Sequence, residues 1–248
     1  ITGFTGSAGL CLVTLKSAFI FIDGRYKVQV KKEINRGLFQ IILTSDTSFH
    51  SWIQKYCGNQ VIGYDPWLHT VSEIDKLAGE NTANANIKKC SNLVDFIWTK
   101  KPHRISQSLE THPSKFSGTT SKIKRAQIGE IINDNGADAV ILTKPESICW
   151  LLNIRGKDIA HTPIIQSLAI VQKNSNIKLF LRDINISKQI KRFLGDNVEV
   201  FDQTMFLEQV SSIKNQTIQF DPNSCPVAVL DSLTLPTDNI LKLTDPCI

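Results

Sequence analysis

The chain has 248 residues, of which 42% are apolar and 21% charged, so it is long enough to bury two hydrophobic cores. No apolar run approaches about 18 residues and no basic segment leads into an apolar one at the start, so we expect neither a membrane span nor a signal peptide. The net charge of +5 comes from residues 1–118, which hold 14 basic and 9 acidic residues. The basic segment 27–36 lacks the dense basic residues and the interleaved aromatic residues that are typical of nucleic-acid-binding segments. We interpret it as the solvent-exposed face of a helix.

The first half of the chain alternates between strand and helix patterns. Apolar runs predict strands at 10–14, 19–22 and 39–43, and a short strand that ends at Tyr64. Helical spacing predicts one helix around Val30 and a second over 49–56, which Ser45 or Asp46 is expected to cap.

The second half repeats this order after an opening of its own. The pattern predicts helices at 123–135, at 145–152, before Gly195 and around Phe206, and strands at 139–142, 168–171, 178–181 and 198–201, with a last strand ending at Phe220. Alternating strands and helices predict an α/β fold. We expect each half to be a mixed layer with its helices on one side of the sheet.

The two halves read as copies of one domain. Segments 59–66 and 215–222 share five identities in eight at an offset of 156, and Val71, Asp75 and Leu77 recur as Val227, Asp231 and Leu233. An Asp-Pro turn is common chemistry, but agreement that continues through the next helix indicates duplication. The second copy opens with a helix and a strand that the first lacks, so an equivalent segment is expected before Ile1. The predicted domains are 1–108 and 121–248, joined by a Pro- and Ser-rich linker at 109–120.

No catalytic constellation is predicted within the chain. The glycine-rich segment 3–9 has neither a P-loop ending nor a dinucleotide fingerprint, and Thr5 breaks the serine-hydrolase elbow around Ser7, so its glycines are interpreted as a tight turn. The five histidines are scattered singly, so no metal site is expected.

The six cysteines form no C-x-x-C pair and several lie in apolar runs, which favours free buried thiols in a reducing compartment. Three disulfides in a secreted protein remain the alternative, and the sequons at Asn185 and Asn215 would fit it.

A polar loop after the apolar helix 145–152 carries Arg155, Asp158 and His161. Loops of this kind often bind ligands, so these three residues are the candidates for facing a substrate cavity. The alternative for each is a structural salt bridge or a turn.

Five segments taken in order are similar to the three-domain aminopeptidase P, or Xaa-Pro aminopeptidase, family. They are residues 1–9, 21–26, 63–70, 92–98 and 151–159. The resemblance covers essentially the whole chain and implies two tandem creatinase-type N-terminal domains.

The resemblance further implies a cytoplasmic hydrolase that removes an N-terminal residue preceding proline. It would act with two divalent metal ions, Mn²⁺ or Zn²⁺, and as a homodimer. The ligands belong to a C-terminal catalytic domain expected beyond Ile248, so this chain alone is predicted to be inactive and to hold no cofactor. Its domains would then shape substrate access or oligomer contacts, with no nucleic-acid or membrane partner. The alternative is a non-catalytic peptide- or histone-binding module.

Overall fold

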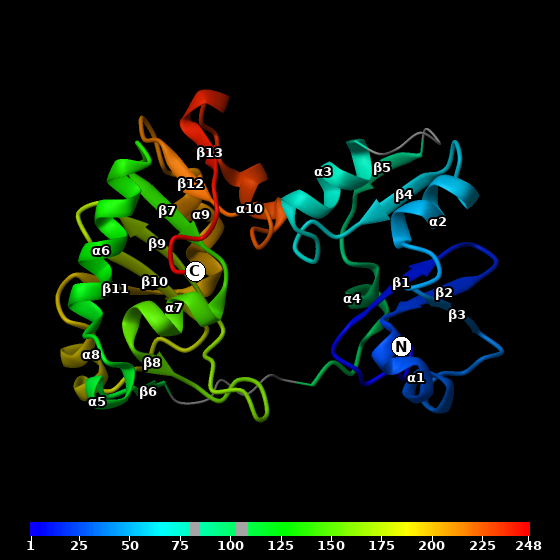
Figure 1. Cartoon of the computed structure of the whole chain (residues 1–248), viewed down its shortest axis with the longest axis horizontal. Helices are drawn as coiled ribbons and strands as arrows, with labels where there is room; N and C mark the ends of the chain where they lie inside the picture. Colours follow the sequence, from blue (N-terminus) through cyan, green and yellow to red (C-terminus); the bar gives the residue numbers. More distant parts are fainter. Residues whose placement is uncertain (80–84, 103–108) are drawn as a thin grey trace. The chain divides into compact units, whose positions relative to one another are not determined.

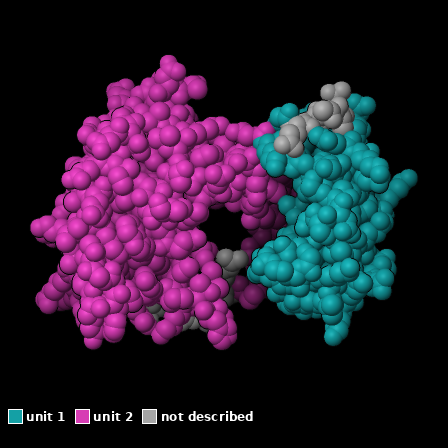
Figure 2. All heavy atoms as spheres, viewed as in Figure 1, with its two compact units in different colours: residues 1–63, 76–88 teal, residues 64–75, 89–248 magenta. Residues whose placement is uncertain are grey.

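The computed structural model describes residues 1–79, 85–102 and 109–248. The chain forms two compact units: unit 1 contains residues 1–63 and 76–88, and unit 2 contains residues 64–75 and 89–248 (Figure 2). The end of the predicted first domain, residue 108, lies outside the described residues.

Unit 1 is built on a three-stranded sheet in the order β1-β2-β3, in which β2 is antiparallel to β1 and parallel to β3. A second sheet pairs β4 with β5. The elements of this part of the chain are β1 (Gly9–Val13), β2 (Ala18–Ile22), η1 (Gly24–Tyr26), α1 (Lys27–Glu33), β3 (Phe39–Leu43), α2 (Phe49–Tyr56), β4 (Val61–Tyr64), α3 (Val71–Gly79, which begins in unit 2) and β5 (Asn86–Lys89).

Helices cover both faces of the unit 1 sheet (Figure 1). Along β2, Ile20 and Ile22 pack with Val30 of α1, whereas Phe21 packs with Trp52 of α2. Successive side chains of a strand point to opposite faces, so α1 and α2 lie on opposite sides. The prediction that the helices lie on one side is therefore wrong for this sheet.

Unit 2 contains a six-stranded sheet in the order β11-β10-β9-β7-β12-β13. The strand β9 is antiparallel to both of its neighbours, and the other pairs are parallel. The elements are α4 (Leu93–Ile97), β6 (Glu110–Thr111), α5 (Ser114–Ser117), α6 (Ser121–Asp134), β7 (Ala139–Leu142), α7 (Pro145–Leu152), β8 (Ile154–Arg155), β9 (Ser167–Gln172), β10 (Ile177–Leu181), α8 (Lys188–Leu194), β11 (Val198–Asp202), η2 (Gln203–Met205), α9 (Phe206–Ser211), β12 (Ile218–Phe220), α10 (Val227–Ser232), η3 (Thr237–Asn239) and β13 (Ile240–Lys242).

The large sheet of unit 2 is also covered on both faces. Leu179 of β10 belongs to a core with residues of α6, α7 and α8. Its neighbour Phe180 points the other way and packs edge-on against Phe206 of α9, with ring centroids 5.0 Å apart. Both phenylalanines are fully buried. The mixed α/β fold predicted for each half is confirmed, but helices again lie on both sides.

Several local predictions can be compared with the structure. The bounds of β7 and α7 agree with those predicted, whereas α2 is capped by Ser48, whose hydroxyl accepts from the Ser51 amide, and not by Ser45 or Asp46. The predicted linker, 109–120, contains β6 and α5, and β6 pairs with β8 of unit 2. The domain boundaries stay a prediction.

All six cysteines are free thiols in the structure. Among the described residues, no helix is both long enough and apolar enough to cross a bilayer.

Gly129 of α6 lies so close to the backbone of a neighbouring turn that a side chain at this position should destabilise the fold. A Cβ atom there would lie 2.6 Å from the carbonyl oxygen of Lys173, in the turn between β9 and β10. Gly129→Ala should therefore lower the free energy of unfolding by roughly 1 to 3 kcal/mol, although alanine favours helix. Urea unfolding measures this. Gly24→Ala is the control, because its Cβ would meet no atom within 4 Å, and equal midpoints for the two variants would contradict the prediction.

Candidate functional site

The C-terminus of α7 is the centre of the region that carries the candidate residues. The helix ends at Asn153, which adopts a left-handed conformation with φ of 52°. Arg155 Nη1 donates to the carbonyls of Cys149, at 3.2 Å, and Ile154, at 2.8 Å. Lys124 Nζ, from α6, donates to the Trp150 carbonyl at 2.9 Å. Two cationic side chains therefore donate hydrogen bonds to the free carbonyls at the C-terminal end of α7, where the helix dipole is negative.

Lys124 is buried, with 4% of its surface exposed. Its ammonium also donates to Asn153 Oδ1 at 2.7 Å and lies 4.5 Å from the centre of the Trp150 ring. Burial is the main cause that lowers the pKa of Lys124; the nearby Arg155 charge lowers it further, and Cys247 acts in the opposite direction. Our sequence reasoning missed this residue. The available signal was its place on the same helical face as Ile128 and Ile132, which are both buried.

Asp158 and His161 lie on the loop that follows β8. The Asp158 carboxylate accepts from the Gln166 amide at 2.7 Å, and an isolated bridge joins Ile159 to Thr162. His161 is exposed and has a positive φ of 62°. This loop therefore folds back on itself and presents His161 to solvent, whereas the Arg155 guanidinium contacts the end of α7.

Gly156 begins the same loop and is required by its packing. A Cβ atom there would lie 2.7 Å from Ile165 Cβ and 2.9 Å from its Cα. Only glycine allows this approach without movement of the backbone. The loop is thus built on a fixed base beside α7.

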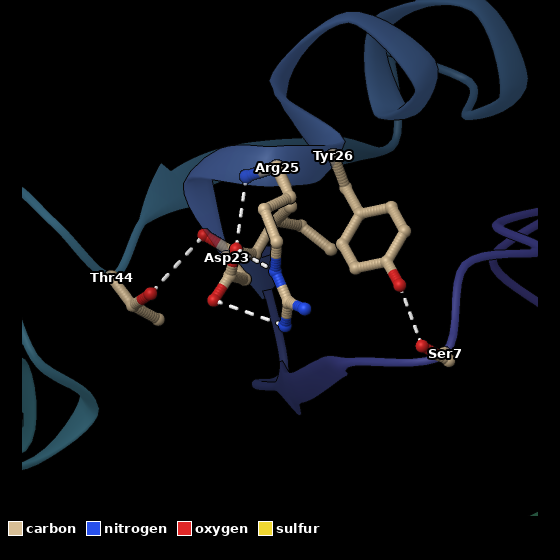
Figure 3. Close-up of polar contacts among 6 residues, drawn as sticks. Ser7, Asp23, Arg25, Tyr26 and Thr44 are labelled. Atoms are coloured by element: carbon tan, nitrogen blue, oxygen red, sulfur yellow. Dashed lines mark hydrogen bonds and ion pairs between the residues drawn. The ribbon is translucent and has the colours of Figure 1, made fainter.

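A second polar cluster lies in unit 1, after β2 (Figure 3). Asp23 caps η1: its carboxylate accepts from the Arg25 amide and from Arg25 Nε, both at 2.9 Å. These bonds lower the pKa of Asp23. The Tyr26 hydroxyl meets Ser7 Oγ at 2.5 Å, while Thr44 Oγ1 donates to the Ile22 carbonyl. Our sequence reasoning used residues 21–26 for the end of a strand, the start of a helix and the family resemblance, but it assigned no polar contacts to Asp23 or Arg25.

The cluster fastens the glycine-rich segment to α1. Glu33 accepts from the amide and the hydroxyl of Thr5, at 2.8 and 2.7 Å, and the Phe4 ring packs edge-on against Tyr26. Gly3 has φ of 78°, and a Cβ there would lie 2.9 Å from the Glu33 carbonyl oxygen. These contacts describe a turn held against a helix, which is the role that we predicted for the glycines.

Metal-ligating side chains do not gather in the part of the chain that the structure describes. Within residues 1–79, 85–102 and 109–248, no three His, Cys, Asp or Glu side chains are placed to hold an ion. His103 lies outside the described residues. The donor set of the described residues therefore does not fit a two-metal cage.

Comparison with family models assigns the chain to a class. The model described as "Creatinase/Prolidase N-terminal domain" matches residues 1–97 in one form and residues 100–248 in a second form. The chain therefore belongs to the creatinase/prolidase N-terminal domain family, with two such domains in tandem.

Several curated proteins that are similar to this chain are named Xaa-Pro aminopeptidase P. A probable Xaa-Pro aminopeptidase P of Penicillium rubens is 29% identical over 226 residues, which is 88% of this chain and 36% of that protein. The corresponding protein of Ajellomyces capsulatus is 30% identical over 212 residues, which is 81% of this chain and 33% of that protein. The chain spans about a third of the length of these curated relatives.

A solved structure shares the fold. The cytosolic X-prolyl aminopeptidase of Caenorhabditis elegans, which is described as having a di-nuclear active site, superposes with a TM-score of 0.89 at 22% identity. The match covers 99% of this chain and 42% of that protein.

Proposed function

We propose that this chain is the N-terminal, non-catalytic region of a metal-dependent Xaa-Pro aminopeptidase that releases the residue preceding proline from peptides. One observation carries the proposal: relatives named Xaa-Pro aminopeptidase P align along 88% of this chain, yet the alignment spans only 36% of their length. The remainder of such a protein would provide the catalytic domain and its two Mn²⁺ or Zn²⁺ ions. The intact protein would act in the cytoplasm as a homodimer.

Within that protein, the loop after β8 would border the entrance to the active site. Asp158 and His161 lie on this loop, and His161 is exposed near its tip. Gly156 and the bond from Gln166 to Asp158 hold the loop in one conformation. A fixed, polar loop can exclude folded chains and meet the far end of a short peptide. Arg155 would position the base of the loop through its contacts with α7.

The proposal predicts that the 248-residue chain alone neither cleaves a peptide with proline at its second position nor binds Mn²⁺ or Zn²⁺ tightly. The physical reason is that no cluster of hard or borderline ligands exists among the described residues. Calorimetric titration with each ion measures the metal binding. A stoichiometric site of micromolar affinity would refute it.

The intact gene product supplies the positive test. Downstream of Ile248 we expect two Asp, one His and two Glu at the spacing of the metal cage, and cleavage of Xaa-Pro peptides that depends on added metal. An intact protein that lacks these ligands but binds histone or other peptides would instead support the non-catalytic binding module.

A further inference from the structure

Two copies of one turn–helix motif lie against each other inside unit 2. We define the first turn motif as residues 64–75 and the second as residues 220–231. In each, an aspartate carboxylate accepts from the amide two residues later at 2.8 Å: Asp65 from Trp67 and Asp221 from Asn223. Each motif then begins its helix at an equivalent valine.

The first pair of contacts between the motifs is reciprocal. The Val71 amide donates to the Cys225 carbonyl at 2.9 Å, and the Val227 amide donates to the His69 carbonyl at 3.0 Å. The offset of 156 places Val71 on Val227 and His69 on Cys225. The second bond is therefore the first with the roles of the two motifs exchanged.

The second pair repeats this exchange one residue further along. The Ser72 amide donates to the Pro222 carbonyl at 2.8 Å, and the Ala228 amide donates to the Pro66 carbonyl at 3.0 Å. Ser72 is equivalent to Ala228, and Pro66 to Pro222. Equal contacts made in both directions are the mark of a two-fold, isologous interface.

Helix geometry explains why these groups pair. The first amides of an α-helix have no acceptor within the helix. Here the first two amides of α3 and of α10 each find carbonyls in the turn of the other motif. An antiparallel bridge joins Thr70 to Pro226 between these bonds, and it needs no amide from Pro226 because only its neighbours donate and accept. These four hydrogen bonds join backbone groups alone, so they tolerate different side chains.

The charged contacts follow the same exchange. Lys242 of β13 pairs with Asp75 of α3 at 2.6 Å, and Lys89 of β5 pairs with Asp231 of α10 at 2.5 Å. Asp75 and Asp231 are equivalent positions. All four side chains are partly exposed, so these pairs contribute less than the backbone bonds. Val71, Val227 and Cys225 are buried beside the backbone contacts.

We propose that the two turn motifs are the halves of a self-complementary pairing surface within unit 2, which joins the two copies of the motif as a homodimer interface joins two subunits. Each motif is the binding partner of the other, and the second motif accepts the first in the way that it would accept its own copy. Asp75 and Asp231 set the register through their lysines.

Proline substitution at the first helical position tests the reciprocity. Val71→Pro and Val227→Pro each remove one donated amide, and proline is tolerated at this position of a helix. Hydrogen exchange should show that Val71→Pro lowers the protection of the Val227 amide by roughly 3- to 10-fold, and that Val227→Pro lowers that of the Val71 amide by the same factor.

The control is Lys188→Pro, at the first position of α8, where the side chain is exposed and the helix belongs to neither turn motif. It should leave both valine amides unchanged. The proposal is wrong if either proline variant leaves the opposite amide unchanged, or if the two factors differ by more than threefold.

A graft tests whether the surface accepts its own copy. Eight substitutions in the full chain give the first motif the sequence of the second: Tyr64→Phe, Trp67→Asn, Leu68→Ser, His69→Cys, Thr70→Pro, Ser72→Ala, Glu73→Val and Ile74→Leu. They retain Asp75 and all four paired backbone groups. Protection of the Val227 amide should stay within about threefold of the parent. A larger loss in the folded graft would overturn the proposed self-complementarity, and a graft that does not fold would overturn it as well, while the proline variants test the reciprocity by themselves.

Discussion

Replacing Lys124 with methionine is expected to lower the free energy of unfolding by about 2 to 4 kcal/mol, the sum of a buried acceptor left without a donor and a desolvated cation–π contact. Asn153 Oδ1 is the acceptor that loses its donor, and the Trp150 ring loses the ammonium 4.5 Å from its centre. Asn153 is 2% exposed, so water does not readily replace the lost bond. Urea unfolding at neutral pH measures the effect.

The same variant has a defined pH dependence. Burial lowers the pKa of Lys124 in the folded chain below its value in the unfolded chain. Between these two values the unfolded chain binds more protons, so the contribution of Lys124 to the free energy of unfolding rises with pH. Methionine lacks this contribution. The difference between parent and variant should therefore widen as the pH rises towards the ordinary pKa of lysine.

Lys122→Met is the matched control, because Lys122 lies on the same helix and is exposed. It should change the free energy of unfolding by less than about 0.5 kcal/mol. A loss for Lys124→Met no larger than that of the control would show that the α7 end does not depend on this cation.

In the intact aminopeptidase that we propose, Arg155→Ala and His161→Ala are expected to act differently. Arg155→Ala removes the bonds to the carbonyls of Cys149 and Ile154, so it should lower the melting temperature, cost about 1 to 3 kcal/mol, and reduce kcat/KM alike for short and long peptides. His161→Ala should leave the melting temperature unchanged. It should reduce kcat/KM by roughly 3- to 10-fold for a pentapeptide, and little for a dipeptide that does not reach the loop.

Steady-state kinetics on a dipeptide and a pentapeptide, both with proline at the second position, beside thermal unfolding, separates the two roles. Thr162→Ala is a neighbouring control on the same loop. Equal losses for both peptide lengths in His161→Ala would end the entrance proposal. If Arg155→Ala caused a length-dependent loss of kcat/KM without a change in melting temperature, Arg155 would contact the peptide substrate itself.

Local sequence alone predicted the order of the main strands and helices and indicated the repeat, but not the short elements β5, β6, β8, β13, α4 and α5. Apolar runs of strand length and a proline at the first helical turn were enough to place β7 and α7 at their observed bounds. The cap of α2 was misplaced because residues 43–47 form a turn of their own, in which the amides of Asp46 and Thr47 both donate to the Leu43 carbonyl. Ser45 and Asp46 belong to that turn, and the helix begins only after it.

Only the tertiary structure decided which face of the sheet each helix covers. Helical periodicity shows that α1 and α2 each have an apolar side, but both sides of β2 are apolar, so nothing local assigns one helix to Ile20 and the other to Phe21. The burial of Lys124 could not be predicted either, because nothing local in the sequence identifies the element that packs on this side chain. A lysine on a helix is usually solvated, and only the position of the α7 carbonyls 26 residues later gives its charge a partner.

The two turn motifs show most directly what the sequence alone cannot predict. An offset of 156 established that Asp65-Pro66 and Asp221-Pro222 are equivalent, because equivalence is a property of the sequence. That the two motifs meet and exchange amides for carbonyls is a matter of position in space. The partners of the α3 and α10 amides lie more than a hundred residues away, and backbone groups carry no side-chain signal that a sequence could show.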